Sequence, residues 1–366
     1  MKSRKWTLPG LLLPGSAMFC FSCSQPPAET VEAPTMPVGQ VVEIQAPLGL
    51  PPVPSPADNP PTAETIALGR RLFYDPVLSK DGTISCANCH QPDFGFADPR
   101  QFSIGVAGGT GDRQAPSVWN AAYYTTQFWD GRAASLEDQA VGPMANPIEM
   151  AHTLESIEKA LAADPSYVAA FEEAFGPGPI TAQAAAKAIA SFERTVLSGN
   201  SPFDRFLYGG DETALSEQAK LGLHVFRDPA KGNCATCHTI EESYALFSDS
   251  KFHNLGVGVD LDGTLKDAGR FKVTNDEKDQ GAFKTPTLRN VAQSAPYMHD
   301  GSLKTLKDVV DFYIGAGNSN PWRDPDVKEL DHLTREERDA LVAFMESLTG
   351  ETPANLGPPP VAETSD

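Results

Sequence analysis

The chain is poor in cysteine, in basic residues and in long apolar runs, and each shortage excludes a class of protein. Six cysteines occur in 366 residues, and two short motifs use four of them. Against 48 Asp and Glu stand 29 Lys and Arg, and the formal net charge of −19 argues against nucleic acid as a partner. The apolar stretch from Leu11 to Phe21 is too short, and too broken by Pro14, to remain in a membrane as a helix.

The four cysteines of these motifs lie in two copies of the pattern C-x-x-C-H. The copies consist of Cys86, Cys89 and His90, and of Cys234, Cys237 and His238. This spacing is the attachment signature of c-type haem, in which two thiols bond to the vinyl groups and the histidine binds the iron. A lone C-x-x-C would also fit a redox dithiol, a disulfide or half a zinc site. The histidine directly after both pairs favours covalent haem at both sites.

The sequences before the two motifs repeat as well. Leu68-Gly-x-x-x-Phe73 precedes the first motif and Leu221-Gly-x-x-x-Phe226 precedes the second, each followed by x-Asp-Pro. A pattern shared outside the motifs indicates that one haem-binding unit was duplicated. Each segment has the spacing of an amphipathic helix, which Thr65 or Ser216 could cap.

Further helices are expected near residues 153–175 and 181–198, and a last helix after the capping-box pattern that begins at Thr334. Strand signals are scarce. We therefore predict an all-α protein of two c-type cytochrome domains, each wrapping one covalently attached haem, with long loops. The predicted organisation is an export signal at 1–23, a Pro-rich tether or wrapping arm at 24–62, an N-terminal peroxidatic domain at 63–205, a C-terminal electron-transfer domain at 206–350 and a disordered tail at 351–366.

The N-terminus has the features of an export signal. Lys2, Arg4 and Lys5 form a basic start before the apolar stretch. Ser22-Cys23 resembles a lipoprotein cleavage site, and an ordinary cleaved signal peptide is the alternative. Either way we expect a periplasmic protein, with a lipid anchor through Cys23 in the lipoprotein case.

Several segments, in order, resemble the bacterial di-haem cytochrome c peroxidases and their MauG-type (methylamine utilisation) relatives. The resemblance extends from about residue 60 to 350 and rests on 85–90, 113–120, 128–133, 135–139, 147–150, 201–205, 284–290 and 296–301. It implies a peroxidase that reduces hydrogen peroxide at the N-terminal haem. Its electrons would pass through the C-terminal haem from a donor such as a small cytochrome c. The alternatives are MauG-type, peroxide-driven oxidation of residues in a partner protein, and a di-haem electron carrier without peroxide chemistry.

The resemblance also assigns catalytic roles. Glu149 matches the distal glutamate, Gln139 the glutamine beside it, and Trp129 the tryptophan between the haems, while Pro143 would shape the distal wall. Splitting the O–O bond needs a proton moved from one oxygen to the other, which a carboxylate in a dry pocket can do. The plainer alternatives are a helix-start acid for Glu149, an exposed polar residue for Gln139 and a core indole for Trp129.

Two positions depart from typical members of that family. Val106 stands where a removable distal histidine is usual, and because valine cannot ligate iron we expect an open first haem. Tyr313 stands where methionine usually ligates the second iron, as in the MauG-type branch. A hard phenolate favours the higher oxidation states of iron. The alternatives are Met298 as the ligand, or Tyr313 as a core residue on the helical face of Leu306 and Val310.

Two further sites follow from the resemblance. His299 is expected to hydrogen-bond a haem propionate rather than to bind iron. One calcium ion would be held by the Gln114 side chain and the carbonyl oxygens of Ser294 and Pro296, which are hard oxygen donors. The family more often has Asn and Thr at the positions of Gln114 and Ser294.

Overall fold

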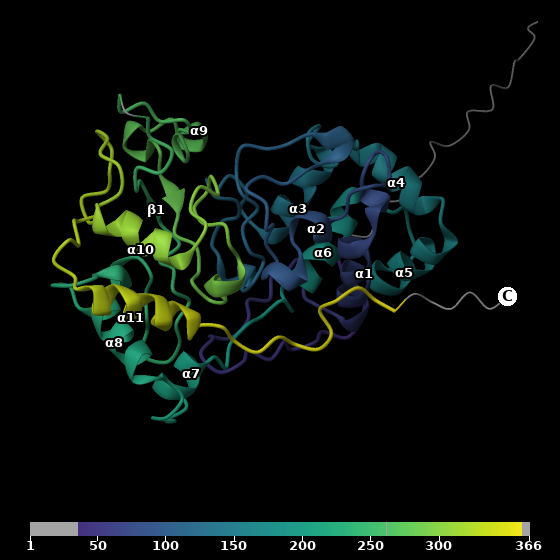
Figure 1. Cartoon of the computed structure of the whole chain (residues 1–366). Coiled ribbons are helices and arrows are strands. Elements are labelled where there is room, and N and C mark those ends of the chain that lie inside the picture. Colours follow the sequence, from purple (N-terminus) through teal and green to yellow (C-terminus); the bar gives the residue numbers. More distant parts are fainter. Residues whose placement is uncertain (1–35, 261, 361–366) are drawn as a thin grey trace, which may run out of the picture. The chain divides into compact units, whose positions relative to one another are not determined.

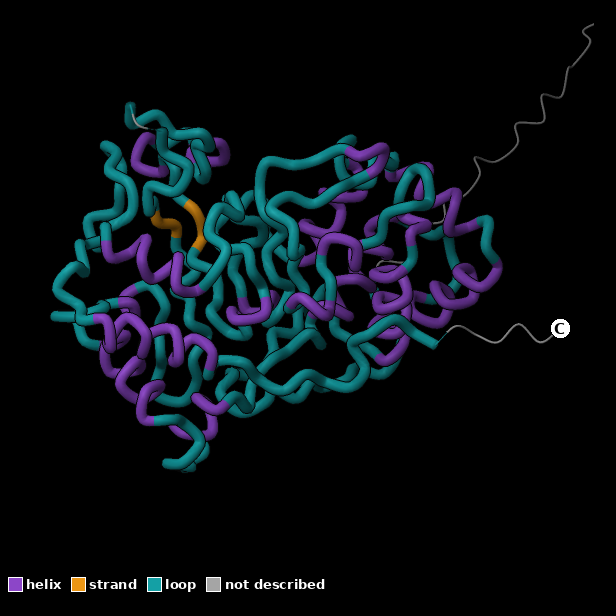
Figure 2. The backbone as a smooth tube through the Cα atoms, in the orientation of Figure 1, coloured by secondary structure: helices purple, strands orange, loops and turns teal. Residues whose placement is uncertain are grey.

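The computed structural model describes residues 36–260 and 262–360, and all of them belong to one compact unit. The predicted export signal, with Cys23, lies outside the described residues. The structure is mainly helical with long loops (Figures 1 and 2). Its α-helices are α1 (Ala63–Tyr74), α2 (Cys86–Cys89), α3 (Leu136–Ala145), α4 (Leu154–Ala162), α5 (Pro165–Phe175), α6 (Ala182–Glu193), α7 (Pro202–Leu207), α8 (Glu217–Arg227), α9 (Phe271–Thr274), α10 (Leu306–Ile314) and α11 (Arg335–Glu346).

Short elements fill part of the loops. The 3₁₀ turns are Pro76–Leu78, Pro92–Phe94, Val106–Gly108, Ala121–Tyr123, Cys234–Thr236, Glu277–Asp279 and Val291–Gln293. Two strands, β1 (Phe252–His253) and β2 (Phe283–Lys284), pair antiparallel. The predicted all-α protein is confirmed as a mostly helical one, because the described residues also include this one small sheet.

The duplicated segment forms α1 in the first half and α8 in the second. Within the described residues, α1 packs on α6 and α8 packs on α11, as Figure 1 shows for the second pair. A Cβ atom on Gly69 would lie 1.8 Å from the Ala188 carbonyl oxygen, and one on Gly222 would lie 2.0 Å from the Ala340 carbonyl oxygen. Both glycines therefore let two helix backbones touch, which accounts for their place in the repeat.

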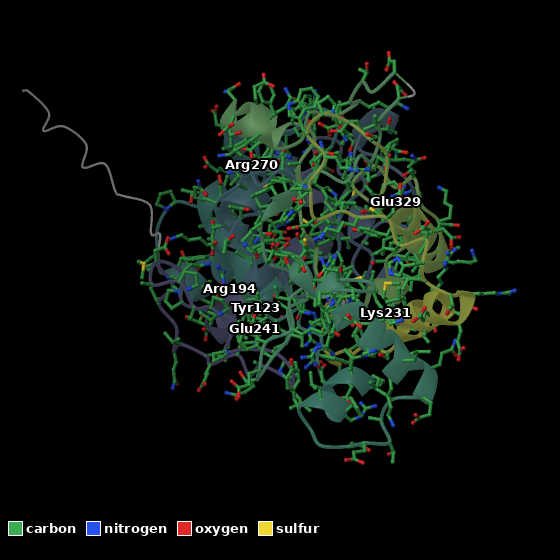
Figure 3. The ribbon with its side chains drawn as sticks, turned by 90° about the vertical axis from the view of Figure 1, so that its left-hand side faces the viewer. Tyr123, Arg194, Lys231, Glu241, Arg270 and Glu329 are labelled. Atoms are coloured by element: carbon green, nitrogen blue, oxygen red, sulfur yellow. The ribbon has the colours of Figure 1, made fainter. Side chains whose placement is uncertain are left out.

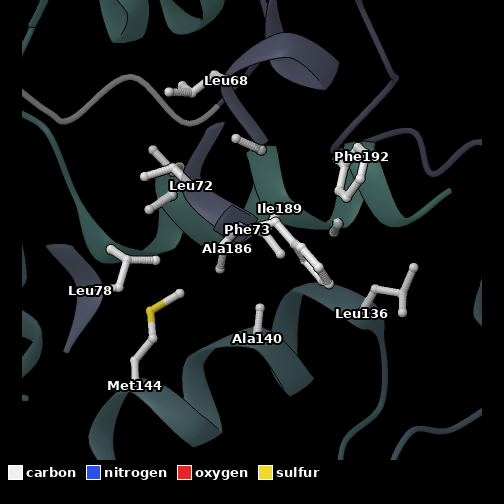
Figure 4. Packing of buried hydrophobic residues seen from close by; sticks show 14 of the residues in the cluster. Leu68, Leu72, Phe73, Leu78, Leu136, Ala140, Met144, Ala186, Ile189 and Phe192 are labelled. Atoms are coloured by element: carbon white, nitrogen blue, oxygen red, sulfur yellow. The ribbon is translucent and has the colours of Figure 1, made fainter. Parts of the chain in front are cut away.

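Two hydrophobic clusters surround these helix pairs. The first includes Leu72 and Phe73 of α1, Met144 of α3 and Ile189 of α6, which Figure 4 shows packed together. The second joins residues of α8, α10 and α11, including Phe226 and Phe344, whose ring centroids are 4.9 Å apart. Each cluster lies against its own C-x-x-C-H motif, because Cys86 packs on the first cluster and Cys234 on the second.

Caps fix where the main helices begin. Thr334 opens α11 with the expected capping box, and Ser216 caps α8. The expected cap of α1 at Thr65 is wrong by three residues: Thr62 is the N-cap, and Thr65 is its partner in a capping box. The expected helix over 153–175 is divided, because Asp164-Pro165 ends α4 and starts α5.

The chain before α1 and after α11 lies against the helices. In residues 36–62, the Gly49 carbonyl accepts from Arg289 at 2.6 Å and the Pro51 carbonyl from Tyr123 at 2.8 Å, contacts of the kind that a wrapping arm makes. In residues 351–360, the Gly357 carbonyl accepts from Arg70 at 2.6 Å. This bond ties the segment to α1, and the disordered tail at 351–366 stays a prediction.

Candidate haem and peroxide site

The first C-x-x-C-H motif forms one helical turn, α2. Ser85 and Asn88 close a capping box in front of it, and the His90 amide donates to the Cys86 carbonyl at 2.9 Å. The Nδ1 atom of His90 lies 3.2 Å from the Phe96 carbonyl oxygen and 3.1 Å from that of Pro116. Nε2 is therefore the nitrogen left for iron, because a hydrogen bond from one ring nitrogen to a carbonyl orients the other toward the metal.

The second motif repeats this arrangement. The His238 amide donates to the Cys234 carbonyl at 2.9 Å, and Nδ1 of His238 lies 2.8 Å from the Phe247 carbonyl oxygen. Burial lowers the pKa of both His90 and His238, which favours the neutral imidazole that binds metal. All four motif cysteines are free thiols in the described chain. The residues present therefore fit two covalently attached haems.

Glu149 lies beside the first motif. Burial is the main cause that raises the pKa of the Cys89 thiol, and the charge of Glu149 adds to that increase. Burial raises the pKa of Glu149, while a hydrogen bond from Asn146 and the charge of Arg132 oppose that shift. The Asn146 amide donates to Oε1 of Glu149 at 2.6 Å. The carboxyl group is thus held close to the haem-binding turn in a partly dry setting.

The loop at Val106 packs directly on the Glu149 turn. The Val106 amide donates to the Glu149 carbonyl at 2.8 Å, and the Val106 side chain is buried. A Cβ atom on Gly105 would lie 2.2 Å from the Ile148 carbonyl oxygen. The position at which a blocking histidine is usual therefore lies next to Glu149, and it carries an apolar side chain.

Gln139 and Pro143 lie on α3, the helix that leads into this turn. They are four residues apart and share a helix face. The Met150 amide donates to the Pro143 carbonyl at 3.3 Å, so Pro143 contacts the Glu149 turn. Gln139 is partly buried, and its catalytic role stays a prediction.

Trp129 lies where the two halves of the chain meet. Its indole Nε1 donates to the Gln114 carbonyl at 2.8 Å, and its own carbonyl accepts from the Lys284 amide of β2 at 2.8 Å. Nearby, Arg270 donates to the carbonyl of Asp130 at 2.9 Å; Figure 3 labels Arg270 among the side chains. Trp129 is therefore bonded to both halves, through its indole to the first and through its main chain to the second.

Tyr313 lies near the second motif. It packs on the second hydrophobic cluster from α10. Burial raises the pKa of its phenol, and the neighbouring Cys234 and Cys237 thiols add to that increase. Because burial disfavours the phenolate, an iron cation is the partner that would stabilise it. Met298, the rival ligand, is partly buried and has a positive φ of 70°. The choice of Tyr313 stays a prediction.

His299 and Gln114 meet through the backbone. The Gln114 amide donates to the His299 carbonyl at 2.8 Å, and the His299 ring stacks on Phe283 with centroids 3.6 Å apart. Burial lowers the pKa of His299 to about 4, so a neutral ring is available to a propionate. The Gln114 side-chain Nε2 donates a hydrogen bond to the Asp98 carbonyl at 3.2 Å, so the side-chain Oε1 is the atom that would bind a cation. The calcium site at Gln114, Ser294 and Pro296 stays a prediction.

Sequence reasoning missed Asn146 and Arg132 near the first motif, and it placed His253 only as a residue that lines the second haem pocket. Asn146 and Arg132 both act on Glu149, and the Asn-Pro pair at 146–147 signals only a turn. His253 lies between the carboxylates of Asp324, at 2.5 Å, and Asp249, at 3.1 Å. Its ring and Asp249 also lie within 4.8 Å of the Cys237 sulfur. Because Cys237 is part of the second C-x-x-C-H motif, this cluster belongs to the second candidate haem site.

Fold and site together define a c-type cytochrome with two haem-binding halves. The family profile described as "Di-haem cytochrome c peroxidase" matches residues 63–213, and the profile "Cytochrome c" matches 220–349. The chain belongs to the di-haem cytochrome c peroxidase family. It is an oxidoreductase of the cytochrome c peroxidase type with two c-type haems.

Named relatives fall on both branches of the family. The chain is 41% identical over 303 residues to the methylamine utilization protein MauG of Methylorubrum extorquens, covering 82% of this chain and 83% of that protein. It is 42% identical to the cytochrome c peroxidase Ccp of Escherichia coli, covering 81% of this chain and 60% of that protein. A crystal structure of a MauG-like protein associated with microbial copper homeostasis matches with a TM-score of 0.75 and 34% identity, covering 83% of this chain and 95% of the other.

Within residues 36–260 and 262–360, the structure contains no helix that is both long and apolar enough to cross a membrane.

Proposed function

We propose that this protein reduces hydrogen peroxide at its N-terminal haem site, with electrons that pass through the C-terminal haem. The balanced reaction joins one peroxide, two electrons and two protons to give two waters. The observation that carries the proposal is the Glu149 carboxyl, which burial keeps protonated to higher pH, beside the first motif and next to Val106. The iron of the first haem supplies a peroxide-binding position and electrons.

Glu149 moves the proton in this scheme. A carboxyl with a raised pKa can take a proton from one peroxide oxygen and return it to the other. Val106 offers no ligand atom for iron, so the side chain at this position would not have to leave before peroxide binds. Pro143 and Val106 contact the main chain of the turn that carries the carboxyl.

Electrons reach this site by way of Trp129 in the proposal. The support is its position: the indole is bonded to Gln114 in the first half, and its main chain is bonded to Lys284 in the second. A π-system fixed at that junction can relay electrons between haems held by His90 and His238.

Stopped-flow mixing of the resting ferric protein with peroxide tests the proposal. We expect fast haem oxidation in the wild type and a reaction at least about 100-fold slower in Glu149→Gln, the usual contribution of a proton-transfer group. Glu173→Gln is the matched control, because Glu173 is exposed on α5. If Glu149→Gln reacts as fast as the wild type, Glu149 has no role in the chemistry.

The MauG-type activity is a second candidate. It is favoured by Tyr313 near the second motif and by the relative named MauG. Adding reduced cytochrome c to the stopped-flow experiment separates the two activities. Rapid cytochrome oxidation indicates the peroxidase, whereas fast haem oxidation without cytochrome turnover indicates oxidation of a partner protein. A pure electron carrier would instead have two low-spin haems in the resting electron paramagnetic resonance spectrum and no reaction with peroxide.

The proposed location is the periplasm. The basic and apolar start of the chain is typical of an export signal, and c-type haem is attached outside the cytoplasm. Lipid attachment through Cys23 stays a prediction, which mass spectrometry of the purified mature protein would test.

A further inference from the structure

The turn that carries Glu149 is organised around one side chain, Asn146. Its amide nitrogen donates to Oε1 of Glu149 at 2.6 Å, while its Oδ1 accepts from the Ile148 amide at 3.2 Å. Its carbonyl accepts from the Glu149 amide at 3.1 Å and from the Ala151 amide at 2.9 Å. One residue thus bonds both the main chain and the carboxyl group of Glu149.

Asn146 also joins this turn to α3. It is the residue at the C-terminal cap of that helix, and its amide donates to the Gly142 carbonyl at 3.0 Å and the Pro143 carbonyl at 3.3 Å. Because α3 packs on α6 in the first hydrophobic cluster, the position of the Asn146 side chain is set by the core. A rigid helix end therefore determines where the Glu149 carboxyl lies.

We propose that Asn146 is the positioning residue for Glu149: its amide fixes the carboxyl over the first motif and leaves Oε2 as the oxygen that carries the proton. This inference rests on the proposed function of Glu149. A neutral amide that donates to one oxygen favours the charged carboxylate, so it opposes the effect of burial. The group is thereby kept able both to accept and to release a proton.

Few other charges face this carboxyl. Arg132, from the loop after Trp129, lowers the pKa of Glu149, and Cys89 faces it from α2. Residues 103–109 pack on the turn and contain no ionisable side chain. His152, at the end of the turn, has Lys80 as its charged neighbour. The hydrogen bond from Asn146 to Glu149 can therefore be removed by a neutral substitution that changes no charge near the carboxyl.

Two variants separate the bond to Glu149 from the shape of the turn. Asn146→Ser keeps an oxygen that can accept from the Ile148 amide, but its side chain is too short to reach Oε1 of Glu149. Asn146→Asp keeps the size and that acceptor, and replaces the donor by a like charge. Ile148→Ala is the matched control, since Ile148 is exposed in the same turn.

The readout is the protonated carboxyl band in the infrared spectrum of the resting holoprotein, titrated with pH and assigned by its loss in Glu149→Gln. We expect the apparent pKa of Glu149 to rise by about one unit in Asn146→Ser, a tenfold change in proton affinity, and by more in Asn146→Asp. Ile148→Ala should titrate as the wild type does. In the stopped-flow experiment, the pH dependence of the peroxide reaction should move upward with the band.

The titration requires no turnover, so it separates two failures. If both Asn146 variants titrate like the wild type, the positioning role is wrong even when Glu149→Gln is slow. If the band moves as expected while Glu149→Gln reacts at the wild-type rate, Asn146 does position the carboxyl and the proposed function of Glu149 fails. A shift in Ile148→Ala equal to that in Asn146→Ser would overturn the proposal, because any disturbance of the turn would then suffice.

Discussion

Replacing Gly222 by alanine should destabilise the second half of the protein, although alanine is the better helix former. In the interior of a helix the change gains about 1 kcal/mol of intrinsic propensity. The added Cβ atom would lie 2.0 Å from the Ala340 carbonyl oxygen and 2.7 Å from the Phe344 Cβ atom. An ordinary contact requires more than 3 Å, so α8 and α11 would have to move apart by about 1 Å.

The two effects oppose each other, and the clash should be the larger. Overpacking in a dense core costs about 1–3 kcal/mol, and here the contact is with main chain, which cannot rotate away. The cluster that α8 and α11 share contains Phe226 and Phe344, whose packing would loosen. We therefore expect a net loss of up to about 2 kcal/mol after the propensity gain of about 1 kcal/mol is subtracted.

Denaturant unfolding of the holoprotein, followed by far-ultraviolet circular dichroism, measures this loss. Gly111→Ala is the matched control, because a Cβ atom there would find its nearest neighbour at 4.0 Å. Gly69→Ala should act on the first half in the same way, since its Cβ atom would lie 1.8 Å from the Ala188 carbonyl oxygen. A Gly222→Ala protein more stable than the wild type would mean that helix propensity decides, and the backbone-contact explanation of the repeat would be wrong.

Three further predictions concern buried charge and the second haem. Arg289→Met should cost about 3–5 kcal/mol in denaturant unfolding, because it leaves Asp204 buried without its partner at 2.8 Å; Arg335→Met, at a side chain 95% exposed, should cost almost nothing. Glu193→Gln should become increasingly stabilising between pH 5 and pH 8. Burial raises the pKa of Glu193 to about 8, so the folded wild type holds a proton that the unfolded chain releases, and its stability falls as pH rises through that range. Equal urea midpoints for Glu193→Gln and the wild type at both pH values would contradict this. Tyr313→Met should raise the reduction potential of the second haem in spectroelectrochemical titration, and an unchanged potential would remove Tyr313 from the iron.

The helical repeat could be predicted because it depends on local pattern. The Leu-Gly-x-x-x-Phe spacing indicated two amphipathic helices, and Ser216 was correctly predicted to cap α8, whereas the cap of α1 is Thr62 and not Thr65. The reason for Gly69 and Gly222 could not be predicted, because it lies in the backbone of distant helices. The sequence contains the helix break Asp164-Pro165, but the helical spacing of apolar residues continues on both sides, so a single helix was predicted there.

Some residues of the candidate site could not be predicted from the sequence for a similar reason. Glu149 was proposed as a site residue because its segment resembles the family. Asn146 was not proposed, because the role of Asn146 depends on a side-chain hydrogen bond of 2.6 Å formed inside a turn. Arg289 lies in a segment that resembled the family, but nothing local indicates that it also holds Gly49, 240 positions away. Long-range partners of this kind become visible only when the chain is folded.

The attachment of Trp129 has a mechanical consequence. Its indole nitrogen is bonded to the carbonyl of Gln114, and its main chain is bonded to Lys284 in β2. A rotation of one half against the other would therefore have to bend the loop at 126–130 or break one of these bonds. On the proposed electron path through Trp129, a change at either anchor should therefore alter the rate of electron exchange without altering either haem.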